Sequence, residues 1–453
     1  MGSMIGSGVF IVSADIARQV GGGLWVLVVW AVAGLMTVLG AASYGELASL
    51  FPAAGGQYVY LREAFGRAPA FLYGWTLFLV IQTGTLAAVA VAFAKFLGVL
   101  VPAISASEYV LYLPDLPGGV AIGVTTQQAV AVAVLAALTA NNSFGLSAGK
   151  AVQNVFTVLK VATLLGVTAL GLAHASDAGA LRASDFAAAF RADGPISASG
   201  LPVAIAVALV GALFSADAWN NVTFAAGEVR APERTVPRAL VLGTVVVVTL
   251  YLVTNVAYLN VLAQPEVAAA PDDRVATALM RAVLGPPGAA VMAALVMVST
   301  FGCLNGMVLA GPRLYYAMAA DGLFLSAAGR LSPRTRVPTW GLWVQGAWAA
   351  VLALSGTYGD LLDYVIFAAL LFYAVSVAGV FRLRRTRPDL PRHYSAPGYP
   401  VLPALYVAAC VFVMGVLLVE KPGYTWPGLG IVAAGVPVYL LVRRRRAAPE
   451  EPA

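Results

Sequence analysis

Two short breaks in otherwise apolar segments hold the residues of this chain best suited to bind a small polar molecule. The first is Gly6-Ser7-Gly8, and the second runs from Ser215 to Trp219, roughly 210 residues later. Backbone at bilayer depth must satisfy its own hydrogen bonds, so a break is tolerated there only where it lines a cavity within the protein. Two such breaks in corresponding positions predict the midplane substrate site of an inverted-repeat transporter. The alternative is close helix packing at the glycines and a simple kink at Ser215.

The composition indicates that these breaks lie within a membrane. Hydrophobic residues make up 60% of the 453 residues and charged residues only 11%, whereas soluble domains carry about 25% charged residues. Apolar spans of about 20 residues, long enough to cross a hydrocarbon core of about 30 Å, recur along the chain. They cover approximately 1–20, 24–50, 69–101, 125–141, 152–173, 201–226, 239–262, 287–318, 339–355, 361–381, 400–419 and 425–442. We therefore expect an all-α membrane protein with about twelve transmembrane helices, the first of them incomplete.

The order of these spans suggests an internal repeat. The first and sixth helices are both broken, so helices one to five (about 1–173) and six to ten (about 201–382) are expected to form two repeats. Because five is odd, the second repeat must enter the membrane in the opposite orientation. The transporter core is thus expected to cover 1–382, with helices eleven and twelve and a basic tail in 383–453. The longest polar stretches are loops around 102–124, 174–199, 263–286 and 383–399, so we expect no soluble domain.

Positive charges are unevenly distributed between the alternate loops. With the N-terminus in the cytoplasm, nineteen lysines and arginines fall on the cytoplasmic side and six on the other, which is the usual positive-inside bias. This predicts a multi-pass plasma-membrane protein with both termini in the cytoplasm. The net charge of +6 thus indicates the lipid bilayer as partner and no nucleic acid. The run Arg443–Arg446 is expected to stop at the inner headgroups, with lipid binding a secondary role.

Four segments in order resemble the amino acid–polyamine–organocation superfamily, and within it most closely the L-type amino acid transporter branch. They are GSMIGSGVFIVSADI (2–16), SYGELASLFPAAGGQYVYLREAFG (43–66), LFSADAWNNVTFAAGEVRAPERTVPRAL (213–240) and STFGCLNGMVLAGPRLYYAMAADGLF (299–324). The resemblance implies a five-plus-five inverted repeat with broken first and sixth helices. It also implies secondary active transport of L-amino acids by alternating access, as sodium-independent exchange or proton-coupled uptake of neutral amino acids. The alternative is a basic amino acid or polyamine antiporter.

The first break then has a physical role. Where the first helix unwinds, the backbone N–H groups of Ser7, Gly8 and Val9 are freed at the N-terminus of the following half-helix, which suits a substrate carboxylate. Glycine is required where the substrate must touch the backbone, because a side chain would block the approach. We assign Ile5, Gly6, Ser7, Gly8 and Val9 to the substrate site.

The second break would serve the other end of the substrate. Carbonyl groups of Phe214, Ser215 and Ala216 would face the α-ammonium group from a half-helix C-terminus. The resemblance implies that the Phe214 ring closes over bound substrate, and that Trp219 and the pair Asn220-Asn221 shape the wall. Packing in the core or against lipid is the alternative for the two aromatic residues.

Asp217 admits two roles. An intramembrane carboxylate is a functional candidate by default, and it could pair with a cationic substrate. Related carriers of neutral amino acids, however, often read Tyr-Asp-Gly-Trp here, which favours a carboxylate that caps the freed backbone. Ala216 replaces the tyrosine and Ala218 the glycine in this chain, which leaves the preferred side chain open.

Lys160 is a cationic residue well inside the apolar fifth span. The resemblance places it where sodium-coupled relatives bind a cation beside the first helix, which implies sodium independence and a lysine able to load and release a proton. A fixed structural bond to first-helix carbonyls is the alternative. Lys95 lies nearer a helix end and is expected to extend toward the headgroups.

Three further residues are weaker site candidates. By resemblance, Thr83 and Gly84 lie in the third helix where the family lines its side-chain pocket. Asn305, between Gly302 and Gly306, marks a closely packed eighth helix that faces the pocket.

Other functional classes find little support in the sequence. The two histidines, His174 and His393, fall in loops on opposite sides of the membrane, without the spacing of a metal site. Neither a nucleophile–base set nor the repeated filter loops of a channel are evident. We therefore expect no enzyme activity, no cofactor and no metal.

The start of the chain is expected to be incomplete. The five residues before Gly6 would cover only about 7.5 Å as a helix, whereas half of the hydrocarbon core measures about 15 Å. We expect the natural chain to begin upstream of Met1.

Overall fold

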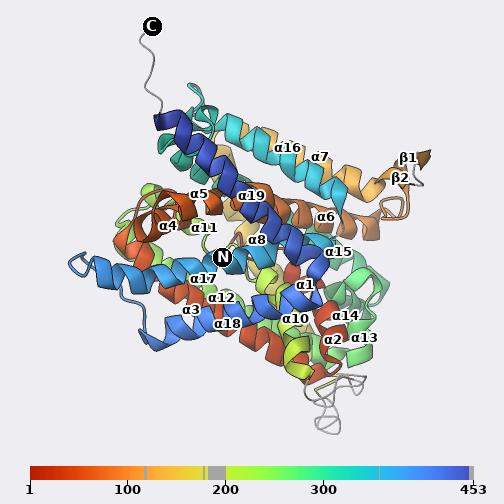
Figure 1. The fold of residues 1–453 in the computed structure, drawn as a ribbon. Helices are drawn as coiled ribbons and strands as arrows, with labels where there is room; N and C mark the ends of the chain where they lie inside the picture. The colour runs from red at the N-terminus through yellow and green to blue at the C-terminus, as the bar shows by residue number, and fades with distance from the viewer. Residues whose placement is uncertain (117–119, 177–178, 182–199, 357, 448–453) are drawn as a thin grey trace.

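The computed structural model describes residues 1–116, 120–176, 179–181, 200–356 and 358–447, and helices dominate them (Figure 1). Eight helices in this part of the chain are long and apolar enough to cross a membrane. Seven are single elements, and the eighth joins α5 (Arg67–Thr76), the π-helical turn η1 (Leu77–Ile81) and α6 (Gln82–Leu100). The seven are α3 (Gly23–Leu50), α8 (Leu146–Ala173), α12 (Pro232–Val261), α15 (Pro286–Ala320), α17 (Tyr358–Thr386), α18 (Val401–Glu420) and α19 (Pro422–Ala447). The protein is thus a multi-pass helical membrane protein.

Shorter helices occupy the remaining predicted spans. The first span contains α1 (Gly8–Ile11) and α2 (Ser13–Val20), and the sixth contains α10 (Leu201–Ser215) and α11 (Asn221–Phe224). The other two are α7 (Thr126–Ser143) and α16 (Thr339–Ser355), which lie side by side. Each of the twelve predicted spans therefore coincides with helical structure, although only eight meet the length and hydropathy of an independent membrane crossing.

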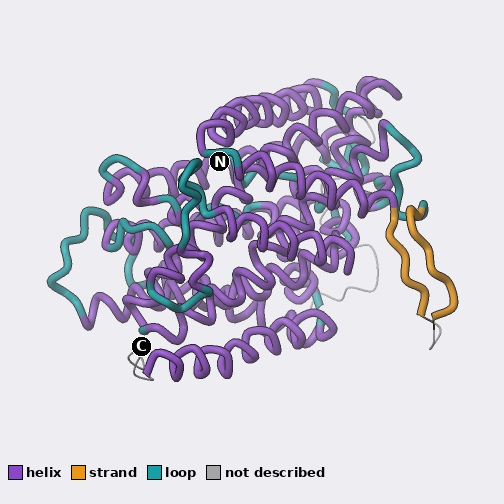
Figure 2. The backbone as a smooth tube through the Cα atoms, turned by 90° about the horizontal axis from the view of Figure 1, so that it is seen from above, coloured by secondary structure: helices purple, strands orange, loops and turns teal. Residues whose placement is uncertain are grey.

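Two stretches that the sequence analysis treats as loops are ordered secondary structure. Residues of the first form an antiparallel hairpin of β1 (Tyr109–Leu116) and β2 (Val120–Thr125) that projects from the helical body (Figure 2). Its aromatic and β-branched residues favour strands, a signal that the charge and hydropathy pattern alone does not reveal. The second, around 263–286, folds into α13 (Gln264–Ala268), the turn η4 (Pro271–Asp273) and α14 (Val275–Leu284). The hairpin of β1 and β2 corrects the expectation of an all-α protein, because it adds two strands to the helices.

The helix ends define two opposite faces of the molecule. We call the end that carries the hairpin, α13 and α14 the hairpin face, and the end that carries α4 (Gln57–Phe65) the α4 face (Figure 1). The charge distribution predicts that the α4 face is cytoplasmic.

Glu46 is buried near the α4 face. Its side chain is 1% exposed, and both carboxylate oxygens accept hydrogen bonds from Arg384, at 2.9 and 2.6 Å. Arg392 and the backbone N–H of Ala396 donate to the same carboxylate at 3.3 and 2.8 Å. A buried carboxylate needs such partners, and this one fastens α3 to α17 and to the loop before α18.

Candidate functional site

The first break ends at a helix N-terminus, as the sequence predicts. α1 begins at Gly8 with Ser7 as its N-cap, and the Val12 N–H bonds to the Gly8 carbonyl, so that α1 runs almost directly into α2. The first N–H groups of a helix have no intrahelical acceptor. Gly8 and Val9 therefore present free donors at this point, and both residues are buried.

Lys160 holds the unwound segment that precedes the break. Its Nζ atom donates to the carbonyl oxygen of Gly2 at 2.6 Å and to that of Ile5 at 2.9 Å. Its side chain is fully buried. The ammonium group thus satisfies two backbone carbonyl groups of a segment that forms no regular helix.

Neighbouring side chains complete this support. Tyr251 of α12 donates its hydroxyl to the Met4 carbonyl at 2.9 Å. From α15, Ser299 lies 3.3 Å from the carbonyl oxygens of Ile5 and Gly6, and Cys303 Sγ lies 3.0 Å from that of Ser3. The unwound segment is thus fixed by α8, α12 and α15 together.

The second break follows the end of α10 at Ser215. The Asp217 N–H bonds back to the Phe214 carbonyl at 3.1 Å, and Ala218 then adopts a left-handed conformation with φ of +62°. Such a conformation costs an L-residue about 1–2 kcal/mol. The alanine thus stands in a place that favours a residue without Cβ.

The Asp217 carboxylate is already engaged within the protein. Its Oδ1 atom accepts from the Tyr373 hydroxyl at 2.6 Å, and the backbone N–H of Ala218 also bonds to it. The carboxylate therefore caps the turned backbone of the break and ties it to α17.

The two breaks meet at Gly8. A Cβ atom placed there would lie 2.6 Å from Ser215 Cβ and 2.7 Å from Ser215 Cα, closer than real Cβ contacts. Gly8 is therefore required for the contact between the first break and α10, in addition to the exposed backbone that the sequence analysis predicts.

A small cavity lies between the breaks, and we call it the central cavity. Its volume is about 20 Å³, room for about one water molecule. It is lined by Ser3, Met4, Gly6, Ser7, Gly8, Thr85, Val89, Phe214, Ser215, Asp217, Ala218, Cys303 and Met307. An amino acid can therefore bind here only if the surrounding helices move apart.

The structure brings together six of the predicted site residues on this cavity: Gly6, Ser7, Gly8, Phe214, Ser215 and Asp217. The other predicted residues are not part of its lining. Ile5 and Val9 use their carbonyl groups to bond Lys160 and Tyr258, and Ala216 is the C-cap of α10.

Three predicted residues of the surrounding helices, Thr83, Gly84 and Asn305, are also absent from the cavity lining. The Thr83 hydroxyl bonds to the Phe78 carbonyl across the π-helical turn, and Gly84 packs against Val365. The Asn305 amide donates to Gln153 Oε1 and accepts from Asn142 Nδ2.

Trp219 packs against other aromatic residues. Its ring lies 4.8 Å from that of Tyr44 and 5.3 Å from that of Tyr373 between centroids. Thr85 and Met307, which the sequence pattern does not single out, line the cavity from α6 and α15. Thr85 follows Thr83 by two residues, so a small error in the helical phase explains why the sequence predicts Thr83 in the lining instead of Thr85.

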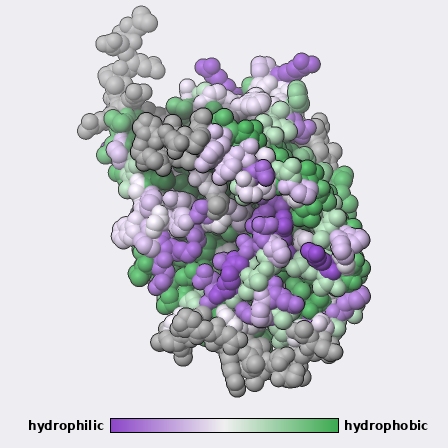
Figure 3. All heavy atoms as spheres, turned by 90° about the vertical axis from the view of Figure 1, so that its right-hand side faces the viewer, coloured by the Kyte–Doolittle hydropathy of each residue, from purple (hydrophilic) through white to green (hydrophobic). Residues whose placement is uncertain are grey.

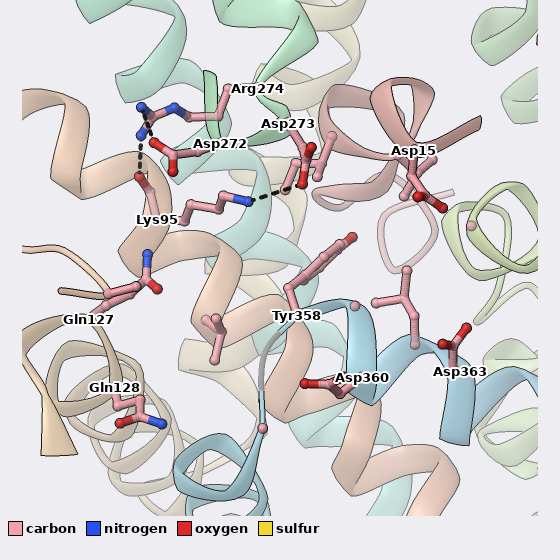
Figure 4. A pocket seen from close by; sticks show the side chains of 18 of the residues that line it. Asp15, Lys95, Gln127, Gln128, Asp272, Asp273, Arg274, Tyr358, Asp360 and Asp363 are labelled. Atoms are coloured by element: carbon pink, nitrogen blue, oxygen red, sulfur yellow. Dashed lines mark hydrogen bonds and ion pairs between the residues drawn. The ribbon is translucent and has the colours of Figure 1, made fainter. Parts of the chain in front are cut away.

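A vestibule of about 940 Å³ opens from the hairpin face toward the central cavity. Hydrophilic side chains gather near the middle of this face (Figure 3). Tyr358 lies between charged residues of the vestibule (Figure 4). Its hydroxyl is 3.3 Å from Ser7 Oγ, and its ring meets that of Phe214 edge to face at 6.0 Å. One layer of side chains, made of these three residues, thus separates the vestibule from the central cavity.

A second chamber of about 380 Å³ approaches from the opposite side. It is lined by Glu228 and Arg313 near the α4 face and by Met4, Ala218 and Trp219 near the breaks. Met4 and Ala218 also line the central cavity. The cavity between the breaks is therefore approached from both faces, each time through a thin barrier.

A closed cavity between two helix breaks, with a chamber on either side, is the architecture of a membrane transporter. The profile of the family described as "Amino acid permease" matches residues 1–440, and the chain belongs to this family. This confirms the resemblance drawn from the four sequence segments.

Characterised relatives are similar over almost the full chain. The b(0,+)-type amino acid transporter 1 of Mus musculus is 28% identical over 94% of this chain and 82% of its own length. The cystine/glutamate transporter of Homo sapiens is 30% identical over 97% and 82%, respectively. The serine/threonine exchanger SteT of Bacillus subtilis (strain 168) is 27% identical over 99% and 95%. The function of the family to which this chain belongs is amino acid transport across a membrane.

The first prediction tests the contact at Gly8. Gly8→Ala should lower transport about tenfold or more, because overpacking of this kind costs about 1–3 kcal/mol and separates the two breaks. Adding Ser215→Gly removes the opposing Cβ and Oγ atoms and should restore part of the activity. The measurement is initial uptake in proteoliposomes.

Gly415→Ala in α18 is the matched control, because a Cβ at Gly415 meets nothing within 4 Å. It should transport as the unaltered protein does. Unchanged uptake by Gly8→Ala would contradict the close approach of the breaks.

The second prediction concerns backbone strain at the second break. Ala218→Gly should raise the free energy of unfolding by up to about 1 kcal/mol, because glycine adopts positive φ without a steric penalty. Ala216→Gly, where φ is −89°, should instead lower it by about 0.5–1 kcal/mol. Thermal unfolding of the purified protein in detergent measures both. Shifts of the same sign in the two variants would refute a strained Ala218.

Proposed function

We propose that this protein carries neutral L-amino acids across the cytoplasmic membrane by sodium-independent alternating access, as an exchanger or a proton-coupled uptake carrier. The observation that carries the proposal is the central cavity, which lies between the two breaks and is sealed from each chamber by one thin layer. Opening one layer at a time would expose the cavity to one face and then to the other, which is what alternating access requires.

The backbone of the breaks supplies the groups that an amino acid needs. The free N–H donors of Gly8 and Val9 sit at a positive helix end and suit the α-carboxylate. The last carbonyl groups of α10, which ends at Ser215, form the negative end of a helix and suit the α-ammonium group. These backbone groups recognise any L-amino acid, so side-chain preference must come from the residues around them.

Asp217 favours a neutral substrate over a cationic one. The residue is 8% exposed, and its carboxylate is held by Tyr373 and the Ala218 backbone. A cationic side chain would have to compete with both partners. A basic amino acid or polyamine antiporter is the alternative, and competition by lysine or putrescine as strong as that by neutral amino acids would favour it.

We further propose twelve membrane crossings, with helices one to five and six to ten as inverted repeats and both termini in the cytoplasm. Support comes from the position of the breaks: each broken segment precedes a long helix, α3 in the first half and α12 in the second, and these two long helices pack against each other. The excess of positive charge near the α4 face supports the orientation.

Uptake of labelled amino acids into proteoliposomes tests the proposed function. Twenty unlabelled amino acids should compete to different extents, with neutral ones strongest, and replacing sodium by choline should leave the rate unchanged. Stimulation of efflux by external substrate at equal pH identifies exchange, whereas acceleration by an inward proton gradient identifies symport. Uptake that requires sodium, or an absence of uptake for all twenty, would contradict the proposal.

The third prediction concerns Lys160 and sodium independence. Lys160→Met removes the charge that pairs with the carbonyls of Gly2 and Ile5, so transport should fall about tenfold or more, since unpaired buried carbonyl groups cost about 1–3 kcal/mol each. The variant should not become sodium-dependent, because methionine fills the space of a cation. The measurement is initial uptake with and without sodium at several pH values.

The pH series also separates the two roles of Lys160. A fixed structural bond predicts low transport at every pH, whereas a proton carrier predicts a variant that still exchanges but no longer responds to pH. Unchanged flux and an unchanged pH profile would remove Lys160 from the mechanism.

The vestibule contains an ionic connection between two helices that line it. Asp273 pairs with Arg18 of α2 at 2.8 Å. It also pairs with Lys95 of α6 at 3.6 Å (Figure 4). Lys95, expected to reach the headgroups, thus faces the vestibule instead. Both Asp272 and Asp273 have positive φ, +50° and +62°, a strain that persists only where the surroundings impose it. We propose that this turn restrains the hairpin-face opening.

The fourth prediction tests this restraint. Asp273→Asn should change the KM for substrate offered to the hairpin face by up to about fivefold, because exposed ion pairs are worth up to about 1 kcal/mol. Asp272→Asn is the matched control, since the one ion pair of Asp272 among the described residues is with Arg274, close by in the chain, and not with a side chain of α2 or α6. Initial rates in whole cells measure both variants. Equal changes in KM for the two would refute a restraint specific to Asp273.

A further inference from the structure

A second small cavity adjoins the central cavity, and we call it the polar chamber. Its volume is about 10 Å³, close to the space of one water molecule. Thr85, Asp217, Ala218 and Met307 line both cavities. When the helices around the central cavity move apart to admit a substrate, the two spaces would join around these shared residues.

The polar chamber is lined by hydrogen-bond donors that the protein leaves without partners. The Tyr73 hydroxyl, Gln57 Nε2 and Asn221 Nδ2 are buried and have no hydrogen-bond partner among the described residues. Tyr73 and Gln57 are 1% and 0% exposed. The orientation of the Gln57 amide is fixed, because its Oε1 atom accepts from Asn220 Nδ2 at 3.1 Å, so its Nε2 atom is the donor that remains.

Three other side chains of the chamber already make hydrogen bonds within the protein. The Thr85 hydroxyl donates to the Ile81 carbonyl at 2.7 Å, and Gln82 Nε2 donates to the Met307 carbonyl at 2.8 Å. Asp217 Oδ1 accepts from Tyr373. The chamber, with room for about one water molecule, is therefore lined by three residues that carry an unpartnered donor, Tyr73, Gln57 and Asn221. Buried donors without acceptors cost about 1–3 kcal/mol each, so the chamber calls for one acceptor oxygen.

We propose that the polar chamber binds the side-chain oxygen of the substrate, and that the carrier selects amino acids with short hydroxyl side chains over their apolar isosteres. This inference rests on the proposed function and specifies its substrate class. A hydroxyl oxygen replaces one water molecule and accepts from Tyr73, Gln57 or Asn221. A methyl group of the same size leaves these donors unpaired, and a site built to bond a hydroxyl discriminates strongly against such an analogue.

The Asp217 carboxylate at the chamber narrows the class of substrate further. A side-chain carboxylate could also accept from the donors, but it would lie beside the Asp217 carboxylate, and like charges at short range repel. The combination of unpartnered donors and an adjacent carboxylate thus fits the uncharged hydroxyl side chains of serine and threonine.

Isosteric pairs of amino acids give the sharpest test. Threonine and valine differ by a hydroxyl in place of a methyl group, and serine and alanine by one hydroxyl. In proteoliposomes, threonine should compete for uptake about tenfold or more better than valine, and serine better than alanine. Tyr73→Phe should reduce the threonine-to-valine ratio severalfold, mainly by weakening threonine.

Tyr315→Phe is the matched control, because Tyr315 is a buried tyrosine of α15 whose hydroxyl also has no partner in the described part of the chain, yet it lies outside the chamber. It should leave the ratio unchanged. Gln57→Leu is a second chamber variant, and it should lower the ratio as Tyr73→Phe does.

The outcomes distinguish this inference from the proposed function. Uptake of neutral amino acids with equal competition by threonine and valine overturns the inference and leaves the proposed function intact. A clear preference for threonine that persists in both chamber variants also overturns it. If no amino acid is transported, the proposed function itself fails.

Discussion

The structure depends on how the N–H and carbonyl groups of unwound backbone find hydrogen-bond partners at the depth of the membrane. A carbonyl group that leaves a helix there has no water to bond, so the first break can exist only because other groups replace the missing partners. The Lys160 ammonium group supplies two of the required bonds, to Gly2 and Ile5. With the acceptors satisfied on one side of the break, the N–H donors of Gly8 and Val9 on the other side remain available for an anionic ligand group.

The second break is stabilised differently, through a carboxylate. Asp217 bonds the backbone of the turn and the Tyr373 hydroxyl, so the break between α10 and α11 is tied to α17. A lysine thus supports the first break and an aspartate the second, and the small side chains at Gly8 and Ser215 let the two approach closely. The central cavity is what remains between two such supported breaks. Its small volume indicates a closed arrangement, with the larger chambers on either face held apart from it by single layers of side chains.

Much of this arrangement could be predicted from the sequence because its causes are local. The apolar spans, the two breaks and the buried lysine each leave a direct signal in residue type and spacing, and helices lie at every predicted span. Phase along a helix and long-range pairing leave no such signal. Thr85 lines the cavity in place of Thr83 because a π-helical turn shifts the register. Glu46 is buried because arginines from distant segments reach it, which no local pattern of α3 indicates. Tyr73 and Gln57 line one chamber only because α5 packs against α4 and α4 packs against α17.

The central claim is that the amino acid binds between the two breaks, and a structure of the protein with a bound substrate tests it most directly. The account predicts a widened central cavity that holds the substrate, with its α-carboxylate within about 3 Å of the N–H groups of Gly8 and Val9 and its α-ammonium group near the end of α10. Lys160 should keep its bonds to the carbonyls of Gly2 and Ile5. A substrate found only in the hairpin-face vestibule, with the space between Gly8 and Ser215 still closed, would contradict the account.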